Sequence, residues 1–238
     1  MKTKIADIFT KNHDKYGYIR ITYQLQEEGY RINKKRVYRL MKELGLQANK
    51  KVKKYKLYRV ECGLMAPNLM NQTFETERPY EKLETDVTQF ITRYGKLYLS
   101  PIIDFHDREV LSYDLSEIPD YGQIRRMLNH LYSKHGASII GSILQSDQGY
   151  LYQLGAYQRL LKSMGIIQSM SRKGNCLDNS PTENFFGRLK TEMFYGKEDS
   201  FTSMQHLKDA IVAYIEYYNE ERIVINLHFR PLKPTTIY

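Results

Sequence analysis

The apolar pattern of the chain changes near residue 84, and this change limits the folds that the chain can adopt. Three β-rich runs come first, at Thr85–Thr92, Lys96–Phe105 and Glu109–Leu115. Helical and strand patterns then alternate, in the order helix Tyr121–His135, strand Ser138–Gln145, helix Gln153–Met164, strand Ile166–Met170 and helix Pro181–Phe194. Consecutive strands followed by alternating elements predict an α/β domain, with a mixed sheet flanked by helices.

An amphipathic helix is predicted at the C-terminal end of this region, over Ser203–Glu220. Its apolar stripe has helical spacing and consists of Leu207, Ile211, Tyr214, Ile215 and Tyr218. Neither an internal repeat nor a low-complexity tract is present in the sequence.

The first 47 residues have helical patterns throughout. One predicted helix covers Tyr18–Glu28 and ends at Gly29, and the next begins after Asn33, a favourable N-cap residue. A short turn with Gly followed by a basic helix is typical of a helix-turn-helix. Four cations on the second helix lie mostly off its apolar stripe and could meet phosphates: Lys34, Lys35, Arg36 and Arg39. An ordinary helical hairpin with a solvated charged face is the alternative.

Positive charge is concentrated in one segment of this basic chain. The net charge is +9, and residues 31–60 contain 12 Lys or Arg and one acid, so they carry +11 while the rest carries −2. A basic balance of this size favours a polyanionic partner, either nucleic acid or an anionic membrane surface, and its concentration in one segment indicates a localised binding footprint. Residues 48–60 show no firm helical period and are interpreted as a basic linker.

Cysteine and targeting patterns exclude several classes of protein. The two cysteines, Cys62 and Cys176, are far apart, and no Cys/His spacing typical of a zinc site occurs. There is no signal-peptide pattern and no apolar run long enough to span a membrane. A cytoplasmic, nucleoid-associated protein with no membrane partner is expected.

Three acids stand at the ends or starts of predicted elements. Asp86 lies inside the first β-rich run, Asp147 just past the strand 138–145, and Glu183 in the first turn of the helix 181–194. Ligands collect at such places in α/β sheets, and an acid in an apolar strand is costly unless it is paired or metal-bound. With 27 acids in the chain, position alone proves little. The spacing adds more: 35 residues separate Asp147 from Glu183, and Lys190 follows Glu183 by two helical turns.

The sequence segments around these acids resemble those of a known family. ETDVTQF around Asp86, SDQG at 146–149, SMSRKGNCLDNSPTENFFGRLKTEMF at 169–194 and YIEYYNEERI at 214–223 are similar to the second-frame product of bacterial insertion sequences of the IS-three family. These DDE transposases have a retroviral-integrase-like catalytic core. YGYIRITYQLQEEGYRINKKRVYRLMKELGL also resembles the helix-turn-helix-like module before that core, so the resemblance spans nearly the whole chain.

The resemblance implies a ribonuclease H-like core and a metal-dependent DNA transposase. Asp86, Asp147 and Glu183 become the catalytic triad and the ligands of two Mg²⁺ or Mn²⁺ ions. Water would first expose a 3′-hydroxyl, which would then attack target DNA. Further DNA contacts are expected from Arg172, Lys173, Asn175 and Lys190. The chain departs from the family pattern at Leu83, Gln145 and Lys233.

The predicted organisation has four parts: a helix-turn-helix-like module (1–47), a basic linker (48–75), the catalytic core (76–200), and a C-terminal helix and tail (201–238). The partners are double-stranded DNA, at element ends and target, and further copies of the chain on that DNA. A ribonuclease H-like or Holliday-junction nuclease and a catalytically idle DNA-binding remnant are the alternatives. Nucleophilic catalysis by Cys176 is disfavoured because no His is near it in sequence, and no Arg/His/Tyr set of a tyrosine recombinase is found.

Overall fold

The computed structural model describes residues 1–47, 65–70, 76–171 and 180–222 of the 238-residue chain. Two compact units contain these residues, an N-terminal one that holds residues 1–47 and a larger one that holds residues 65–219. Each unit has a hydrophobic core of its own. The predicted basic linker at 48–75 lies outside the described residues, apart from residues 65–70.

The N-terminal unit is a bundle of three short helices. They are α1 (Lys2–Lys11), α2 (Tyr18–Glu27) and α3 (Lys34–Glu43). Its core draws on all three helices and their connections, and consists of Ile5, Ile8, Phe9, Tyr16, Ile21, Leu25, Ile32, Val37 and Met41. The apolar stripe predicted for the basic helix, α3, is thus the face that packs inward, because residues at helical spacing share one side of a helix.

The turn between α2 and α3 forms as the sequence indicates. Gly29 has a φ of +86°, a left-handed conformation that other residues adopt only with strain. The Asn33 side chain then accepts a hydrogen bond of 2.9 Å from the Arg36 N–H, which satisfies a backbone donor in the first turn of α3. The predicted turn between the two helices and the predicted N-cap of α3 are therefore both confirmed.

The larger unit is built on a six-stranded mixed sheet. Its strands are β1 (Lys82–Thr85), β2 (Thr88–Thr92), β3 (Gly95–Asp104), β4 (Val110–Ser116), β5 (Ile143–Ser146) and β6 (Ile167–Met170). Strand β3 pairs antiparallel with β1, β2 and β4, whereas β1–β5 and β5–β6 are parallel. The predicted α/β class with a mixed sheet is confirmed.

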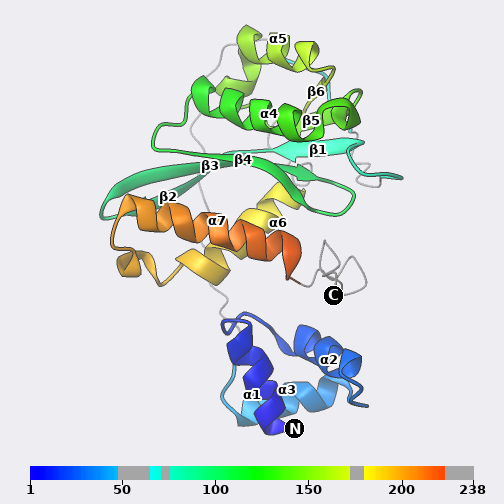
Figure 1. Cartoon of the computed structure of the whole chain (residues 1–238), viewed down its shortest axis with the longest axis vertical. Helices are drawn as coiled ribbons and strands as arrows, with labels where there is room; N and C mark the ends of the chain where they lie inside the picture. Colours follow the sequence, from blue (N-terminus) through cyan, green and yellow to red (C-terminus); the bar gives the residue numbers. More distant parts are fainter. Residues whose placement is uncertain (48–64, 71–75, 172–179, 223–238) are drawn as a thin grey trace. The chain divides into compact units, whose positions relative to one another are not determined.

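Helices cover both faces of this sheet. Helices α4 (Tyr121–His135) and α5 (Gly155–Ser163) lie on one face, and α6 (Ser180–Leu189) and α7 (Met204–Glu220) lie on the other (Figure 1). The stripe predicted for the last helix is buried at every position, which confirms that helix and its inward face. No helix within the described ranges combines the length and apolar character needed to cross a membrane.

The first predicted strand is wrong in one respect. The run Thr85–Thr92 was expected to be one strand with Asp86 inside it, but β1 ends at Thr85 and β2 begins at Thr88. Both strands pair with β3 in the same register, which places Pro101 opposite Asp86. Since proline has no N–H to donate, the ladder is interrupted there, and Asp86 lies just past a strand end.

Two other predicted elements differ from the structure. The strand expected at 138–145 is shorter, because residues Gly136–Ile139 form a 3₁₀ turn and β5 covers only Ile143–Ser146. The helix expected to run through Phe194 changes at Leu189 into a π-helix over Lys190–Phe194. The wider π turn buries Lys190, Met193 and Phe194 together.

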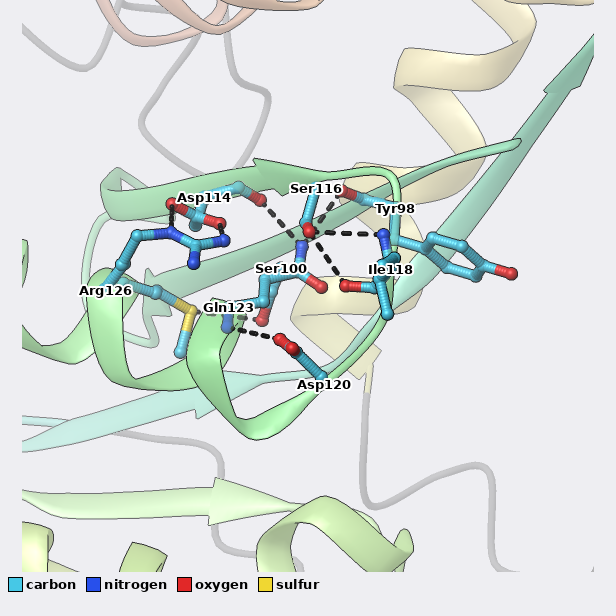
Figure 2. A network of polar contacts seen from close by, with 9 residues as sticks. Tyr98, Ser100, Asp114, Ser116, Ile118, Asp120, Gln123 and Arg126 are labelled. Carbon is cyan, nitrogen blue, oxygen red and sulfur yellow. Dashed lines mark hydrogen bonds and ion pairs between the residues drawn. The ribbon is translucent and has the colours of Figure 1, made fainter. Parts of the chain in front are cut away.

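Helix α4 is attached to the sheet by a buried amide. The Gln123 Nε2 donates hydrogen bonds of 2.9 Å to the Tyr98 carbonyl and 3.0 Å to the Asp114 carbonyl (Figure 2). One turn further along, Arg126 reaches both Asp114 carboxylate oxygens, at 3.1 and 2.9 Å. Since Gln123 is fully buried, its two bonds replace water that these carbonyls cannot reach.

Replacing Gln123 by Leu should destabilise the larger unit by about 1–3 kcal/mol, because two buried carbonyls would lose their donor. Urea unfolding followed by circular dichroism measures this free energy. Asn129→Ala, at an exposed position of the same helix, is the matched control and should change stability by less than about 0.5 kcal/mol. Equal stability of the two variants would contradict the proposed attachment.

Candidate active site

Two of the three predicted acids follow neighbouring parallel strands. In the β1–β5 ladder Glu84 lies opposite Gln145, and Asp86 and Asp147 each come two residues later. Parallel strands end at the same edge of a sheet, so the two carboxylates are brought to one place. Asp147 lies just past the strand, as predicted, and Asp86 occupies the equivalent position beyond β1.

The Asp86 carboxyl is partly buried and interacts with like charges. Its Oδ1 accepts a hydrogen bond of 2.7 Å from the Val87 N–H. Burial, together with the negative charges of Asp147 and Glu183, raises the pKa of Asp86 to about 7 against the opposing effect of the Val87 bond. A carboxyl with this pKa is only partly ionised near neutral pH unless a cation compensates its charge.

The Asp147 carboxyl lies within a tight backbone turn. Its Oδ1 accepts a hydrogen bond of 2.8 Å from the Gly149 N–H, and burial raises the pKa of Asp147 despite this bond. A Cβ added at Gly149 would lie 2.7 Å from that same oxygen, which is closer than van der Waals contact allows. A side chain at position 149 would therefore have to displace the Asp147 carboxylate from this position.

Glu183 occupies the first turn of α6, as predicted, and its side chain is exposed. Burial of part of the side chain raises the pKa of Glu183, and its charge reaches Asp86. Within the described ranges, no three His, Cys, Asp or Glu side chains form a group that could hold a metal ion as they stand. The three acids thus interact electrostatically without forming a closed ligand set.

Lys190 is placed differently from a surface lysine. It is 5% exposed, and its Nζ lies 5.2 Å from the centre of the Phe90 ring. Burial lowers the pKa of Lys190 to about 8, while the charge of Asp86 acts in the opposite direction. The cation is therefore part of the surroundings of Asp86, and its contact with DNA stays a prediction.

The other predicted DNA contacts fall into two groups. Those on α3 are exposed in the N-terminal unit, namely Lys34, Lys35, Arg36 and Arg39. The second group precedes α6 and lies outside the described residues: Arg172, Lys173 and Asn175. Cys176, the disfavoured nucleophile, lies in the same undescribed segment. The exposed cations on α3 share one short helix, so a polyanion could contact several of them at once.

Comparison with known families matches three parts of the chain. Residues 1–54 match an HTH-like domain, and residues 76–176 and 183–235 match integrase core domains. The chain is 48% identical over 227 residues to the putative transposase InsK of insertion sequence IS150 from Escherichia coli, covering 95% of this chain and 79% of that protein. The chain belongs to the insertion-sequence transposases with an integrase core.

Other relatives agree with this assignment. The transposase is 48% identical to a transposase-like protein of Haemophilus influenzae, over 85% of this chain and 92% of that one. It is 34% identical to the transposase of insertion sequence IS904 from Lactococcus lactis, over 98% of this chain and 92% of that one. These matches extend through both the N-terminal unit and the sheet.

Solved retroviral structures share the fold of the transposase. The simian T-cell lymphotropic virus intasome matches with a TM-score of 0.53 at 15% identity, over 97% of this chain and 76% of that one. The second match is the integrase catalytic core of HTLV-2, solved with magnesium in a trimeric form. Its TM-score is 0.52 at 16% identity, over 66% of this chain and 97% of that one. The predicted ribonuclease H-like, integrase-type fold is thus confirmed.

The sequence patterns did not single out one buried acid that lies near the predicted triad. Glu84 is fully buried, and its Oε2 accepts a hydrogen bond of 2.9 Å from the Thr182 N–H at the start of α6. Burial raises the pKa of Glu84 to about 8, opposed by the bonds to Thr182 and by the charge of Arg108. The available signal was an acid two residues before Asp86, which alternation along a strand places on the same face of the sheet.

Asp86→Asn should stabilise the metal-free transposase at pH 8. Folding raises the pKa of Asp86 from 3.8 to about 7. The protonated carboxyl therefore contributes fully to the free energy of unfolding below about pH 4, and this contribution is lost as the pH rises through 7. Asparagine does not titrate, so with EDTA the variant should melt at least about 2 °C above the wild type at pH 8. The difference should shrink towards pH 5.

Thermal melting followed by circular dichroism at both pH values checks this expectation. Asp199→Asn, at an exposed acid of the same unit, is the control and should melt with the wild type at both pH values. A melting difference for Asp86→Asn that is the same at pH 5 and pH 8 would show that repulsion between the carboxylates is not its cause.

Proposed function

We propose that this transposase cleaves DNA at the ends of its insertion sequence and joins those ends to target DNA, using Asp86, Asp147 and Glu183. In the first step water attacks phosphorus and the 3′-oxygen leaves, which exposes a 3′-hydroxyl at the element end. In the second step that hydroxyl attacks a phosphodiester of the target and displaces the target's own 3′-oxygen. No covalent bond to the protein is formed in either step.

The observation that carries this proposal is the electrostatic coupling of the three acids at one edge of an integrase-type sheet. Burial raises the pKa of all three carboxyls, and the charges of Asp147 and Glu183 also raise the pKa of Asp86, so the three acids fit one or two hard divalent cations, Mg²⁺ or Mn²⁺. Such ions, when bound, supply stabilisation of negative charge on the attacking and leaving oxygens. Glu183 has an exposed side chain that is free to turn towards Asp86 and Asp147 and complete the ligand set.

Lys190 has a supporting role in the same proposal. Its buried ammonium lies beside Asp86, so it limits the repulsion between the carboxylates. Bound DNA would bring phosphates to this edge of the sheet, where the ammonium is a donor for their oxygens. Arg172, Lys173 and Asn175, which precede α6 in the sequence, are proposed to continue the DNA path.

The N-terminal unit is proposed to bind the ends of the element. Helix α3 presents four exposed cations and an N-cap turn of the helix-turn-helix type. In this organisation residues 1–47 bind DNA, residues 48–75 connect, residues 76–200 catalyse, and residues 201–238 complete the chain. Transfer of both ends requires two active sites, so we propose that copies of the transposase assemble on DNA.

Glu183→Gln should abolish cleavage and joining, with a loss of at least about 100-fold in rate, because a neutral amide is a poor ligand for a hard cation. The assay uses labelled duplexes made from the DNA that flanks the gene, a supercoiled target and Mg²⁺ or Mn²⁺. Gel analysis separates cleaved ends from joined products, so a nuclease without joining activity would be recognised.

Asp199→Asn is the matched acid-to-amide control and should retain the wild-type rates. Glu183→Gln should also bind the labelled duplex with unchanged affinity, since the proposed end-binding surface lies on α3. Retention of joining by Glu183→Gln would remove Glu183 from the triad. Metal-independent activity of the wild type would overturn the chemistry altogether.

Binding to element ends should depend on salt through α3. Each phosphate contact contributes about 0.9 to the slope of log affinity against log salt concentration. Neutralising the four α3 cations should therefore reduce this slope by about 3 to 4. Fluorescence anisotropy with the flanking duplex measures it for a variant with alanine at Lys34, Lys35, Arg36 and Arg39.

The control removes the same charge from exposed positions on α4 and α5 of the larger unit. It carries alanine at Arg125, Lys134, Arg159 and Lys162. Its salt slope should stay close to that of the wild type. Equal losses in the two variants would mean that net charge, and not the α3 surface, determines the binding.

A further inference from the structure

Three buried polar residues lie between the sheet and the start of α6, and we call them the buried polar cluster: Glu84, Gln145 and Thr182. All three are fully buried. Glu84 and Gln145 are register partners on β1 and β5, so their side chains are on the same face of the sheet. The bond from the Thr182 N–H to Glu84 shows that this face is the one covered by α6.

The cluster has a regular relation to the three acids. Glu84 precedes Asp86 by two residues on β1, and Gln145 precedes Asp147 by two residues on β5. Thr182 directly precedes Glu183 in α6. Each member thus belongs to an element that carries one of the acids or directly precedes it.

A buried acid at this position needs a reason. A strand residue that faces a covering helix is ordinarily apolar, and burying a carboxyl is costly unless it is hydrogen-bonded. Glu84 does form such a bond, and its partner is one of the backbone N–H groups in the first turn of α6, which lack a partner within the helix. The bond fixes the start of α6, and therefore the backbone next to Glu183, against β1.

The cluster also has unused bonding capacity. Both polar atoms of the Gln145 side chain are buried and make no hydrogen bond to any residue that the structure describes. A side-chain amide can donate to a carboxyl and can accept from a hydroxyl, which are the groups that Glu84 and Thr182 supply.

We propose that Glu84 is a positioning residue, which together with Gln145 and Thr182 sets the distance between Glu183 and the two aspartates. This inference rests on the proposed function, because it assumes that the three acids bind divalent cations together. The cluster touches no reacting atom. Its effect is on the geometry of the ligands, in the way that hydrogen bonds behind metal ligands generally increase metal affinity.

The test compares two substitutions that remove the same charge. Glu84→Gln keeps an oxygen acceptor for the Thr182 N–H, whereas Glu84→Leu keeps similar volume without an acceptor. Titration calorimetry with Mn²⁺ and no DNA gives the affinity of each protein. We expect at least tenfold weaker binding for Glu84→Leu and a change of less than threefold for Glu84→Gln. Equal weakening of both variants would overturn the proposed role of the hydrogen bond.

The cleavage assay supplies a second measurement. Glu84→Leu should need at least tenfold more Mn²⁺ for half of its maximal rate, while its affinity for the flanking duplex stays unchanged. Binding of Mn²⁺ by Glu84→Leu at wild-type affinity would overturn the inference. Should Glu84→Leu fail to melt cooperatively, Gln145→Met carries the test, since it removes the amide and keeps the shape. A wild-type Mn²⁺ requirement in Gln145→Met would then overturn the inference.

Glu183→Gln, measured in parallel, separates this inference from the proposed function. Mn²⁺ binding and cleavage that survive in Glu183→Gln would contradict the proposed triad itself. Loss in Glu183→Gln together with wild-type behaviour of Glu84→Leu would leave the triad in place and remove the positioning role alone.

Discussion

The repulsion between carboxylates at one edge of the sheet is the constraint around which the larger unit is arranged. Strands β1 and β5 are parallel and in register, and each is followed by an aspartate at the equivalent position. Burial and like charge raise the pKa of Asp86 to about 7. Acids kept together in this way destabilise the fold when they are ionised, and perturbed carboxyls of this kind are typical of functional sites.

Helix α6 connects this edge to the remainder of the unit. Its first turn carries Glu183, its interior packs Phe185 against Tyr218 of α7, and its continuation turns into a π-helix that buries Lys190. Insertion of a π turn changes the faces of the residues that follow it, and such turns are frequent at functional sites. One helical segment thereby presents an acid at its start and a cation at its end to the same carboxyl, Asp86.

Much of this protein could be predicted because local patterns and tertiary structure agree. The three-helix unit, helix α4, the buried stripe of α7 and the alternation of elements all follow from apolar spacing, caps and glycines. The family could be recognised from short segments around Asp86, Asp147 and Glu183, and the catalytic role of these acids stays a prediction. Strand limits were less predictable, since the end of β1 depends on Pro101, which lies opposite Asp86 in a strand distant in sequence.

The sequence by itself determined the residue types at the site, the spacing between them and the concentration of positive charge before residue 60. Only the tertiary structure decided which groups meet. It buried Lys190 within electrostatic reach of Asp86, and it joined Glu84 to Thr182 across 98 residues of sequence. The physical reason is that periodicity describes one element at a time, whereas pKa values and buried hydrogen bonds depend on neighbours supplied by other elements.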